Sequence, residues 1–231
     1  MTEVTFGAFA AMAWLAATMV TAPVSDCDRL AAYPDDPQRV AAGVTREQVD
    51  LPLALAACER AVDADPTTPR LRYQFARLLF YANENPRAVA QMRRAADEGY
   101  AQAQFVFGTF ITRGRPGAPT DLCLAESYWK RSAAGGRQAA RVQYLRFTLK
   151  GRFETCVARA GDDALRAMLA AATLGATDFY ERLVVEDLSE ALAARRAAPP
   201  PFSPAASSSS ELPSPQFQPA TPNDPPTRRA R

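Results

Sequence analysis

Apolar side chains recur every three to four residues over most of the chain between residues 50 and 196, which places them on one face of a helix. Between residues 69 and 82, four large apolar residues form such a stripe: Leu71, Phe75, Leu78 and Leu79. No segment shows a convincing alternation of apolar and polar residues, so the pattern predicts no strands. We therefore expect an all-α protein.

Glycine and proline mark where the helices end. The pattern predicts helices over residues 50–65, 69–82, 87–98, 101–112, 120–134, 138–150, 162–174 and 178–196. Residues 26–49 are expected to form a short helical turn and then a loop, because Pro34 and Pro37 block a continuous helix. Residues 152–161 give no clear prediction.

Composition divides the chain into three parts. Residues 198–231 hold ten of the nineteen prolines and a run of four serines, so they cannot bury enough apolar surface to offset the entropy of ordering. We expect this Pro/Ser-rich tail to be disordered and a helical domain to occupy residues 26–197. Residues 1–25 form a separate amino-terminal segment.

The amino-terminal segment has the features of an export signal. Residues 4–25 carry no charge, and Phe6 to Val20 is strongly apolar, like the core of a signal peptide. The triplet from Val20 to Ala22 has the small-residue form of a cleavage site, but Pro23 disfavours cleavage there. A membrane tether through residues 4–24 and a buried helix are the alternatives.

Charge and residue types exclude several classes of function. The 27 basic and 25 acidic residues give a net charge of +2, which argues against a nucleic-acid-coating protein. The chain has no histidine, so it has neither a histidine that could act as a general base nor a histidine that could bind zinc. Three adjacent carboxylate pairs lie where helix capping and solvation explain them: residues 35–36, 162–163 and 186–187. We expect no catalytic residues, no metal and no cofactor.

Helix pairs repeat along the chain. Residues 93–105 match residues 130–142 at an offset of 37, which aligns Gly99 with Gly136 and Met92 with Trp129. A further offset of 39 aligns Gly136 with Gly175, and residues 59–66 match residues 93–100 at an offset of 34. A recurrence at this period is typical of helical-repeat arrays, so we expect a solenoid of about four helix hairpins.

The repeat resembles the SEL-like repeats, which are relatives of the tetratricopeptide repeat. The resemblance covers roughly residues 50–190 and is best between Ala103 and Gly136. In this unit the pattern of small, glycine, acidic and aromatic positions falls on Gly108, Gly114, Gly117, Asp121, Ala125, Tyr128, Trp129, Ala133 and Gly136. The unit departs from the pattern at Ile111, where an aromatic residue is usual, and at Ser132, where an alanine is usual.

The resemblance gives the four cysteines a meaning. Exported SEL-like proteins staple their repeats with disulfides, which implies pairs between Cys27 and Cys58 and between Cys123 and Cys156 if this protein is exported. Four cysteines allow three connectivities, and the sequence leaves the other two open. Four unpaired, buried cysteines are the remaining alternative.

A non-enzymatic protein-interaction or scaffold module of the bacterial envelope is the function that these features favour. Solenoids bind partner segments along a concave face, for which Tyr73, Arg137, Arg141 and Tyr144 are the candidate residues. Residues 99–160 carry ten basic and three acidic residues, so this region is either a surface for an acidic partner or an ordinary solvated face. The alternatives are a membrane-tethered assembly factor and, with less support, an envelope hydrolase. The sequence identifies no partner.

Overall fold

The computed structural model of the protein describes residues 23–197. This part of the chain contains helices and no strands, as the sequence predicts. The helices are α1 (Asp26–Ala31), α2 (Leu51–Ala64), α3 (Pro69–Tyr81), α4 (Asn85–Asp97), α5 (Ala101–Thr112), α6 (Leu122–Ala134), α7 (Gln138–Leu149), α8 (Asp162–Gly175) and α9 (Phe179–Ala197). The predicted signal or tether and the predicted tail lie almost wholly outside the described residues. None of the helices between residues 23 and 197 is both long and apolar enough to cross a membrane.

The helices begin where local chemistry predicts. Asp50 and Asp121 accept backbone N–H bonds at the starts of α2 and α6. Helix α4 begins at Asn85, two residues before the predicted start, because Pro86 occupies its first turn instead of the preceding turn. Proline is tolerated at that position, since the first turn leaves its N–H groups unpaired in any case.

The helix ends repeat in space as they do in the sequence. Gly99 and Gly136 close α4 and α6 with φ angles of +92° and +91°. Gly114 and Gly151 close α5 and α7 with φ angles of +57° and +70°. Each pair is 37 residues apart, so the same left-handed turn reverses the chain after corresponding helices. Gly175 departs from this repeat because it is the last residue of α8. The residue that follows, Ala176, caps the helix in an extended conformation.

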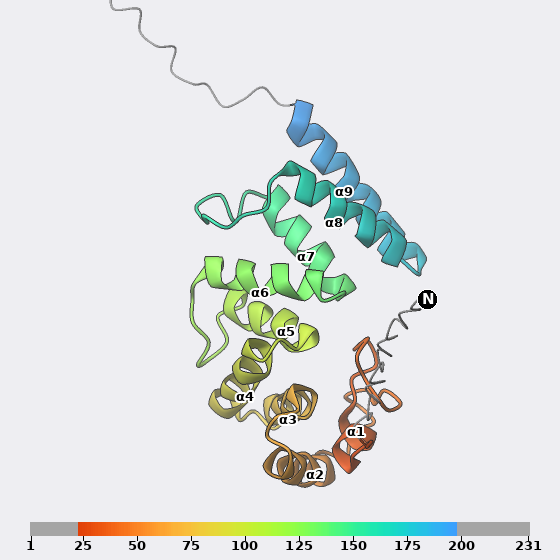
Figure 1. The fold of residues 1–231 in the computed structure, drawn as a ribbon, viewed down its shortest axis with the longest axis vertical. Helices are drawn as coiled ribbons and strands as arrows, with labels where there is room; N and C mark the ends of the chain where they lie inside the picture. The colour runs from red at the N-terminus through yellow and green to blue at the C-terminus, as the bar shows by residue number, and fades with distance from the viewer. Residues whose placement is uncertain (1–22, 198–231) are drawn as a thin grey trace, which may run out of the picture. The chain divides into compact units, whose positions relative to one another are not determined.

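Successive helices pack against one another in chain order from α1 to α8 (Figure 1). A very close contact joins α5 to α6, where a Cβ atom on Gly108 would lie 2.6 Å from Cδ1 and Nε1 of Trp129. The indole Nε1 donates to the carbonyl of Phe105 at 3.0 Å. Gly108 thus provides the space that lets the buried indole lie directly on the α5 backbone.

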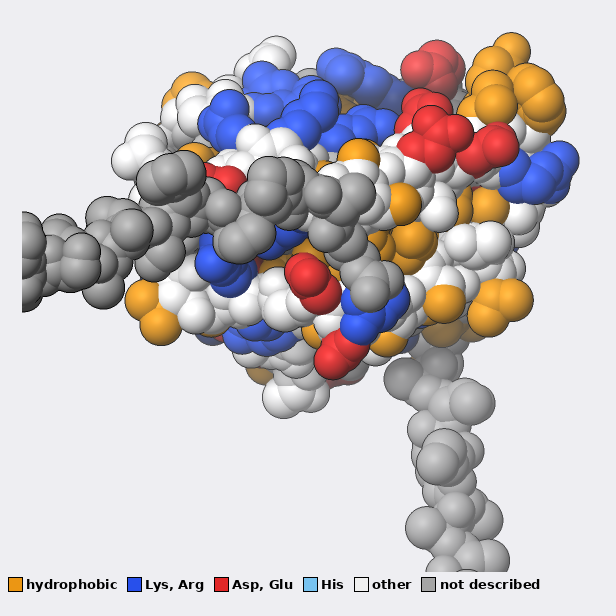
Figure 2. Space-filling model, turned by 90° about the horizontal axis from the view of Figure 1, so that it is seen from above, with side chains coloured by type: hydrophobic (Ala, Val, Ile, Leu, Met, Phe, Trp, Pro, Cys, Tyr) orange, Lys and Arg blue, Asp and Glu red, His pale blue; other side chains and the backbone are white. Residues whose placement is uncertain are grey.

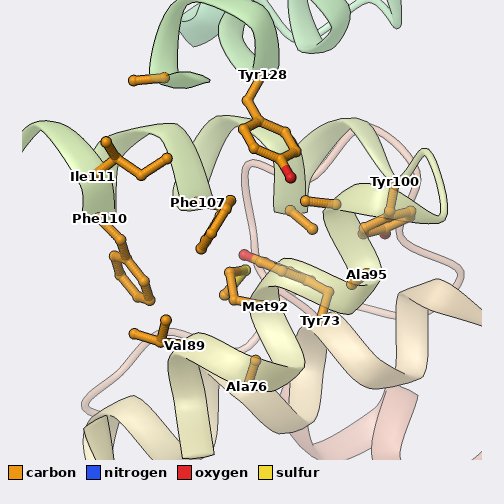
Figure 3. Close-up of a cluster of buried hydrophobic side chains, with 13 residues drawn as sticks. Tyr73, Ala76, Val89, Met92, Ala95, Tyr100, Phe107, Phe110, Ile111 and Tyr128 are labelled. Atoms are coloured by element: carbon orange, nitrogen blue, oxygen red, sulfur yellow. The ribbon is translucent and has the colours of Figure 1, made fainter. Parts of the chain in front are cut away.

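Apolar clusters fill the space between the helices. In one of them, side chains from α3, α4, α5 and α6 meet, and Tyr73, Met92, Phe107 and Tyr128 lie at its centre (Figure 3). The rings of Phe107 and Tyr128 pack edge to face with centroids 4.9 Å apart. A second cluster joins α1, α2 and α3, and a third extends from α6 to α9. No helix pair buries its apolar face alone, which is the expected property of a repeat array.

Two disulfides confirm the cysteine pairing that the family resemblance implies. Cys27 of α1 is bonded to Cys58 of α2, and Cys123 of α6 is bonded to Cys156 in the loop before α8. Each closes a loop of about one repeat, with separations of 31 and 33 residues. A crosslink over such a loop stabilises a fold by roughly 3–4 kcal/mol in the chain-entropy model.

A buried ion pair also fastens α1 to α3. Arg70 donates to Asp28 through Nε at 2.7 Å and Nη2 at 3.1 Å, and Gln74 donates to the same carboxylate. Asp28 is fully buried and completes a capping box with Ser25. Burial alone would raise the pKa of Asp28, but the hydrogen bonds from Arg70, Ser25 and Gln74 outweigh it, so the pKa lies below its ordinary value.

We predict that Gly108→Ala lowers the free energy of unfolding by about 1–3 kcal/mol, because the new methyl group forces the Trp129 indole out of its site. Urea unfolding followed by circular dichroism measures the change. Gly161→Ser is the matched control, since a Cβ at Gly161 meets no atom within 4 Å and serine is a good N-cap. Equal stability of the Gly108 variant and the wild type would contradict the packing described.

We also predict that Asp28→Asn lowers the free energy of unfolding by about 3 kcal/mol at pH 7, because the largely buried guanidinium of Arg70 loses its charged partner. Since the folded pKa of Asp28 is lowered, its contribution is present above its ordinary value of 3.8 and is lost as the pH falls through the folded pKa. The difference between variant and wild type should therefore shrink below pH 3.8. Urea unfolding at a series of pH values measures it.

Asp26→Asn is the control on the same helix. Its partner Arg29 lies 2.9 Å away, but the two side chains are 71% and 59% exposed, so the cost should stay below about 0.5 kcal/mol. A cost for Asp28→Asn that does not change with pH would contradict the charge-based account.

Candidate functional site

Three adjoining hollows run along α3, α5, α7 and α9, and we call them together the inner groove. The aromatic hollow, of about 200 Å³, lies between α3 and α5. The central hollow, of about 460 Å³, lies against α7 and the start of α9, and the distal hollow, of about 410 Å³, follows farther along these two helices. Phe105 and Arg137 line both the aromatic and the central hollow, and Arg146 and Val184 line both the central and the distal hollow.

The aromatic side chains that line the aromatic hollow come from three parts of the chain, and Met92 of α4 and Arg137 also line it. Helix α3 contributes Tyr73, Phe80 and Tyr81, and α5 contributes Phe105 and Phe110. Tyr33, from the loop between α1 and α2, forms the third wall. Aromatic side chains offer large, stiff apolar surfaces, so this hollow can take a bulky apolar group.

Arg77 holds the third wall in place. This buried side chain donates to the carbonyls of Ala31 at 2.9 Å and Val44 at 2.7 Å, and to the Tyr81 hydroxyl at 2.8 Å. Its guanidinium also lies over the Tyr33 ring, 5.0 Å from the centroid. The loop is therefore fixed against α3 by hydrogen bonds that cross 46 and 33 residues of sequence.

Asp36 fixes the same loop to α5. Its carboxylate is buried and accepts a 2.6 Å hydrogen bond from the Tyr100 hydroxyl. Burial raises the pKa of Asp36, and the hydrogen bonds and the positive charge of Arg137 counter part of that rise. The prediction that this carboxylate serves capping and solvation is wrong for Asp36, because the loop folds inward and buries the side chain.

Arg137 differs from Arg77 in having no hydrogen-bonded partner for its side chain. It lies at the junction of the aromatic and central hollows and is 9% exposed. Within residues 23–197 its guanidinium forms no ion pair, and its Nε is a buried donor without an acceptor. The group lies over the ring of Phe105, 5.5 Å from the centroid. A buried cation of this kind is costly unless something pairs with it.

Of the four residues predicted to bind a partner, the structure brings two together. Tyr73 and Arg137 line the same hollow, although Tyr73 is buried and accepts a hydrogen bond from Gln102 Nε2 at 3.2 Å. Burial raises the pKa of the Tyr73 hydroxyl, so it stays protonated. Arg141 lies on α7, half-buried, and contacts Gln138 rather than lining any of the three hollows.

Tyr144 does not face the groove. Its side chain is fully buried among α6, α7 and the loop before α8, where its hydroxyl donates to Glu126 and accepts from the backbone N–H of Ala160. Burial and the hydrogen bond to Glu126 raise its pKa to about 12. The core takes up both the ring and the hydroxyl, because residues 152–161, for which the sequence pattern makes no clear prediction, fold back onto Tyr144.

The repeat-pattern residues between α5 and α6 serve packing and turns. Ala125, Tyr128, Trp129 and Ala133 are buried against neighbouring helices, and Asp121 caps α6. The Tyr128 hydroxyl donates to Asp97 of α4. Gly117, with a φ of +87°, lies in the turn ahead of α6 and approaches Pro86 and Val89. None of these residues lines the inner groove.

The remainder of the groove carries both signs of charge. The central hollow is lined by Arg137 and Arg146 on one side and by Asp35, Asp178 and Glu181 on the other. The distal hollow adds Lys150 and Asp187. Figure 2 shows Lys and Arg side chains gathered on one part of the face seen there, beside a smaller group of Asp and Glu. The basic region of residues 99–160 thus reaches the groove through Arg137, Arg146 and Lys150.

The groove has the chemistry of a binding surface. Among residues 23–197, no cluster of three or more Cys, Asp or Glu side chains is arranged to hold a metal ion. Aromatic rings at one end and mixed charges at the other can hold a chain segment by apolar burial and ion pairing. Sequence reasoning missed the loop of residues 32–49 as a groove wall; the only available indication was its pair of aromatic and acidic residues, Tyr33 and Asp36.

Comparison with known proteins gives likenesses at the level of the fold. A search with protein-family models found no match, and no curated protein matched either. A Sel1 repeat protein from Oxalobacter formigenes has a solved structure that is 18% identical, with a TM-score of 0.47 over 58% of this chain and 97% of that one. A protective antigen of uropathogenic Escherichia coli, described as displaying an SLR fold, is also 18% identical, with a TM-score of 0.41. That match covers 73% of this chain, which spans only 39% of the antigen's length. Both neighbours carry the repeat that the sequence pattern of this chain resembles.

Proposed function

We propose that this protein is a non-enzymatic interaction or scaffold module that binds a segment of another protein along the inner groove. The observation that carries the proposal is the continuity of the three hollows across four helices that are far apart in the sequence. Repeat arrays offer such extended surfaces because neighbouring units present equivalent helices side by side. A partner segment placed there meets aromatic rings first and charged side chains farther along.

The packing of the inner helices supports binding without large rearrangement. Nine consecutive residues of α3 are buried, and the loop of residues 32–49 is fastened by Arg77, Asp36 and a disulfide. A preformed surface loses little conformational entropy when a partner binds, so more of the contact energy appears as affinity. The groove is therefore suited to recognise a segment that is itself flexible.

We further propose that the module works in the bacterial envelope. Two disulfides are typical of proteins that fold in an oxidising compartment, and the apolar amino-terminal segment resembles the signal peptide of an exported protein. Periplasmic residence after cleavage is the first form of this proposal. Retention by an uncleaved tether through residues 4–24 is the second, and it would make the protein a membrane-tethered assembly factor.

An envelope hydrolase is the least supported alternative. Catalytic carboxylates need one apolar setting and one charged setting close together. The groove carboxylates Asp35, Asp178 and Asp187 are exposed, and the half-buried Glu181 accepts hydrogen bonds from Thr177, which suits the four to ion pairing and capping rather than to acid–base chemistry. The proposal therefore assigns the groove to binding.

We predict that a photo-crosslinking amino acid at Gln143 captures a partner protein in cells that produce this protein. Gln143 is half-buried and lines the central hollow. The same amino acid at Arg94, which is exposed on α4 and lines none of the hollows, should give no such adduct. Mass spectrometry of the adducts identifies the captured segment.

A bulky side chain in the central hollow distinguishes a partner bound in the groove from a protein that meets Gln143 by chance. Ala139→Trp places an indole in the central hollow and should lower the adduct yield at Gln143 at least fivefold, whereas Ala90→Trp on the exposed face of α4 should leave it unchanged. Both variants should retain the wild-type circular dichroism spectrum. Equal capture at Gln143 and Arg94, or no effect of Ala139→Trp, would overturn the proposed function.

We predict that the mature protein lacks the first 22 or so residues and is recovered in the periplasmic fraction. Amino-terminal sequencing and fractionation measure both properties. An intact amino terminus in the membrane fraction would contradict cleavage and favour the tethered form. An intact amino terminus in the cytoplasmic fraction would contradict the envelope assignment altogether.

A further inference from the structure

We propose that the aromatic hollow is an anchor site for one kind of peptide feature, namely a carboxylate beside a bulky apolar side chain. This inference rests on the proposed function and specifies the chemistry of the segment that the groove binds. The side chains at the junction of the aromatic and central hollows set three requirements for a ligand: an apolar body, an anionic acceptor and a hydrogen-bond donor.

The apolar requirement follows from the size and lining of the hollow. Its volume of about 200 Å³ is below the roughly 300 Å³ at which pockets for whole small molecules begin, so it suits a single large side chain. Tyr81, Phe80 and Phe105 lie half-buried around it, with apolar surface that still faces solvent. A phenylalanine, leucine or similar side chain that enters the hollow would cover that surface.

The anionic requirement comes from Arg137. Its side chain is more than nine-tenths buried, lines the hollow and forms no ion pair or hydrogen bond within residues 23–197. Asp36 lies close enough for Arg137 to lower its pKa, but its carboxylate is already bonded to the Tyr100 hydroxyl and is not paired with the guanidinium. Asp35, the other nearby acid, is exposed and accepts from the Tyr33 hydroxyl.

Arg77 shows that the fold can satisfy a buried guanidinium when the role is structural. Both arginines line the aromatic hollow, but Arg77 donates through Nε, Nη1 and Nη2 to three protein oxygens. No hydrogen bond or ion pair within residues 23–197 uses the donors of the Arg137 side chain, which lines both the aromatic and the central hollow. A carboxylate accepts from a guanidinium with a geometry that no other common peptide group matches, and it neutralises the buried charge.

The donor requirement comes from Gln102. Its Nε2 donates to the Tyr73 hydroxyl, while its Oε1 is buried at the same hollow without a donor. A backbone N–H of a bound segment supplies such a donor next to the side chain that fills the hollow. A peptide meets all three requirements at once, whereas an acyl chain with a carboxylate head lacks the donor.

Fluorescence anisotropy with labelled eight-residue peptides tests the inference. The reference peptide carries Phe-Glu between Gly-Ser flanks, and matched peptides carry Phe-Gln, Ala-Glu, or a terminal Phe with a free or an amidated carboxyl group. We expect the Phe-Gln and Ala-Glu peptides each to bind about tenfold or more weakly than the better of the two acidic forms. Comparison of the internal glutamate with the free terminus identifies which source of carboxylate the site takes.

Arg137→Gln should weaken binding of the acidic peptide about tenfold or more and should abolish its advantage over the Phe-Gln peptide. Arg141→Gln, which removes an equal charge from the same helix outside the hollows, should change the affinity less than about twofold. Arg137→Met reports on folding: its midpoint of thermal unfolding should equal or exceed that of the wild type, because no ion pair or hydrogen bond within residues 23–197 is lost and the methionine can still pack on the Phe105 ring.

Two results would overturn the inference. One is equal binding of the acidic and neutral peptides by the wild type. The other is an Arg137→Met variant that is strongly destabilised, which would show that the guanidinium supports the fold. If a partner is still captured at Gln143, either result leaves the proposed function standing. If capture at Gln143 fails but the peptides still bind, the groove is not the partner surface, and the anchor site remains.

Discussion

The contact of the Trp129 indole with the backbone at Gly108 sets the spacing on which the rest of the structure depends. A side chain at residue 108 would keep α5 and α6 apart, and the indole could not then reach the Phe105 carbonyl. Phe105 lies on the same turn of α5 and lines the groove on its other side. The packing of one helix pair thereby determines where the junction of the aromatic and central hollows lies.

The helices could be predicted from the sequence because local chemistry determines their ends. Glycines with positive φ, proline in first turns and capping aspartates act within a few residues of the position they mark. The same recurrence identified the repeat and, through the family resemblance, both disulfides. These features need no knowledge of which segments meet in space.

The groove could be predicted only in part because its walls come from segments that are distant in sequence. Arg137 and Tyr73 are two of the four residues predicted to bind a partner, and both line the aromatic hollow. Tyr144 has an equivalent place, yet a loop that carries no periodic pattern covers it. Asp36 and Tyr33 lie in a proline-rich loop whose inward course depends on Arg77, and no local rule predicts that contact.

Arginine and other polar side chains around the groove differ in how fully the protein pairs them, and the proposed binding role rests on that difference. Arg70, Arg77 and Trp129 have their polar atoms satisfied by the protein, and each ties neighbouring segments together. Within residues 23–197, Arg137 and Gln102 keep buried polar atoms without partners, as do Glu126 and Thr148 away from the groove, and such atoms cost folding energy. Sites that bind ligands commonly retain such unsatisfied groups, and the ligand then supplies the missing partners.

Hydrogen–deuterium exchange on the complex with the captured partner tests the central claim, that the inner groove is the binding surface. The account predicts added protection in the loop of residues 32–49, in α5, in α7 and in the first turns of α9, with little change in α4, α6 and α8. Protection confined to α4, α6 and α8 would contradict it, because Met92 is the only residue of these three helices that lines the aromatic or the central hollow.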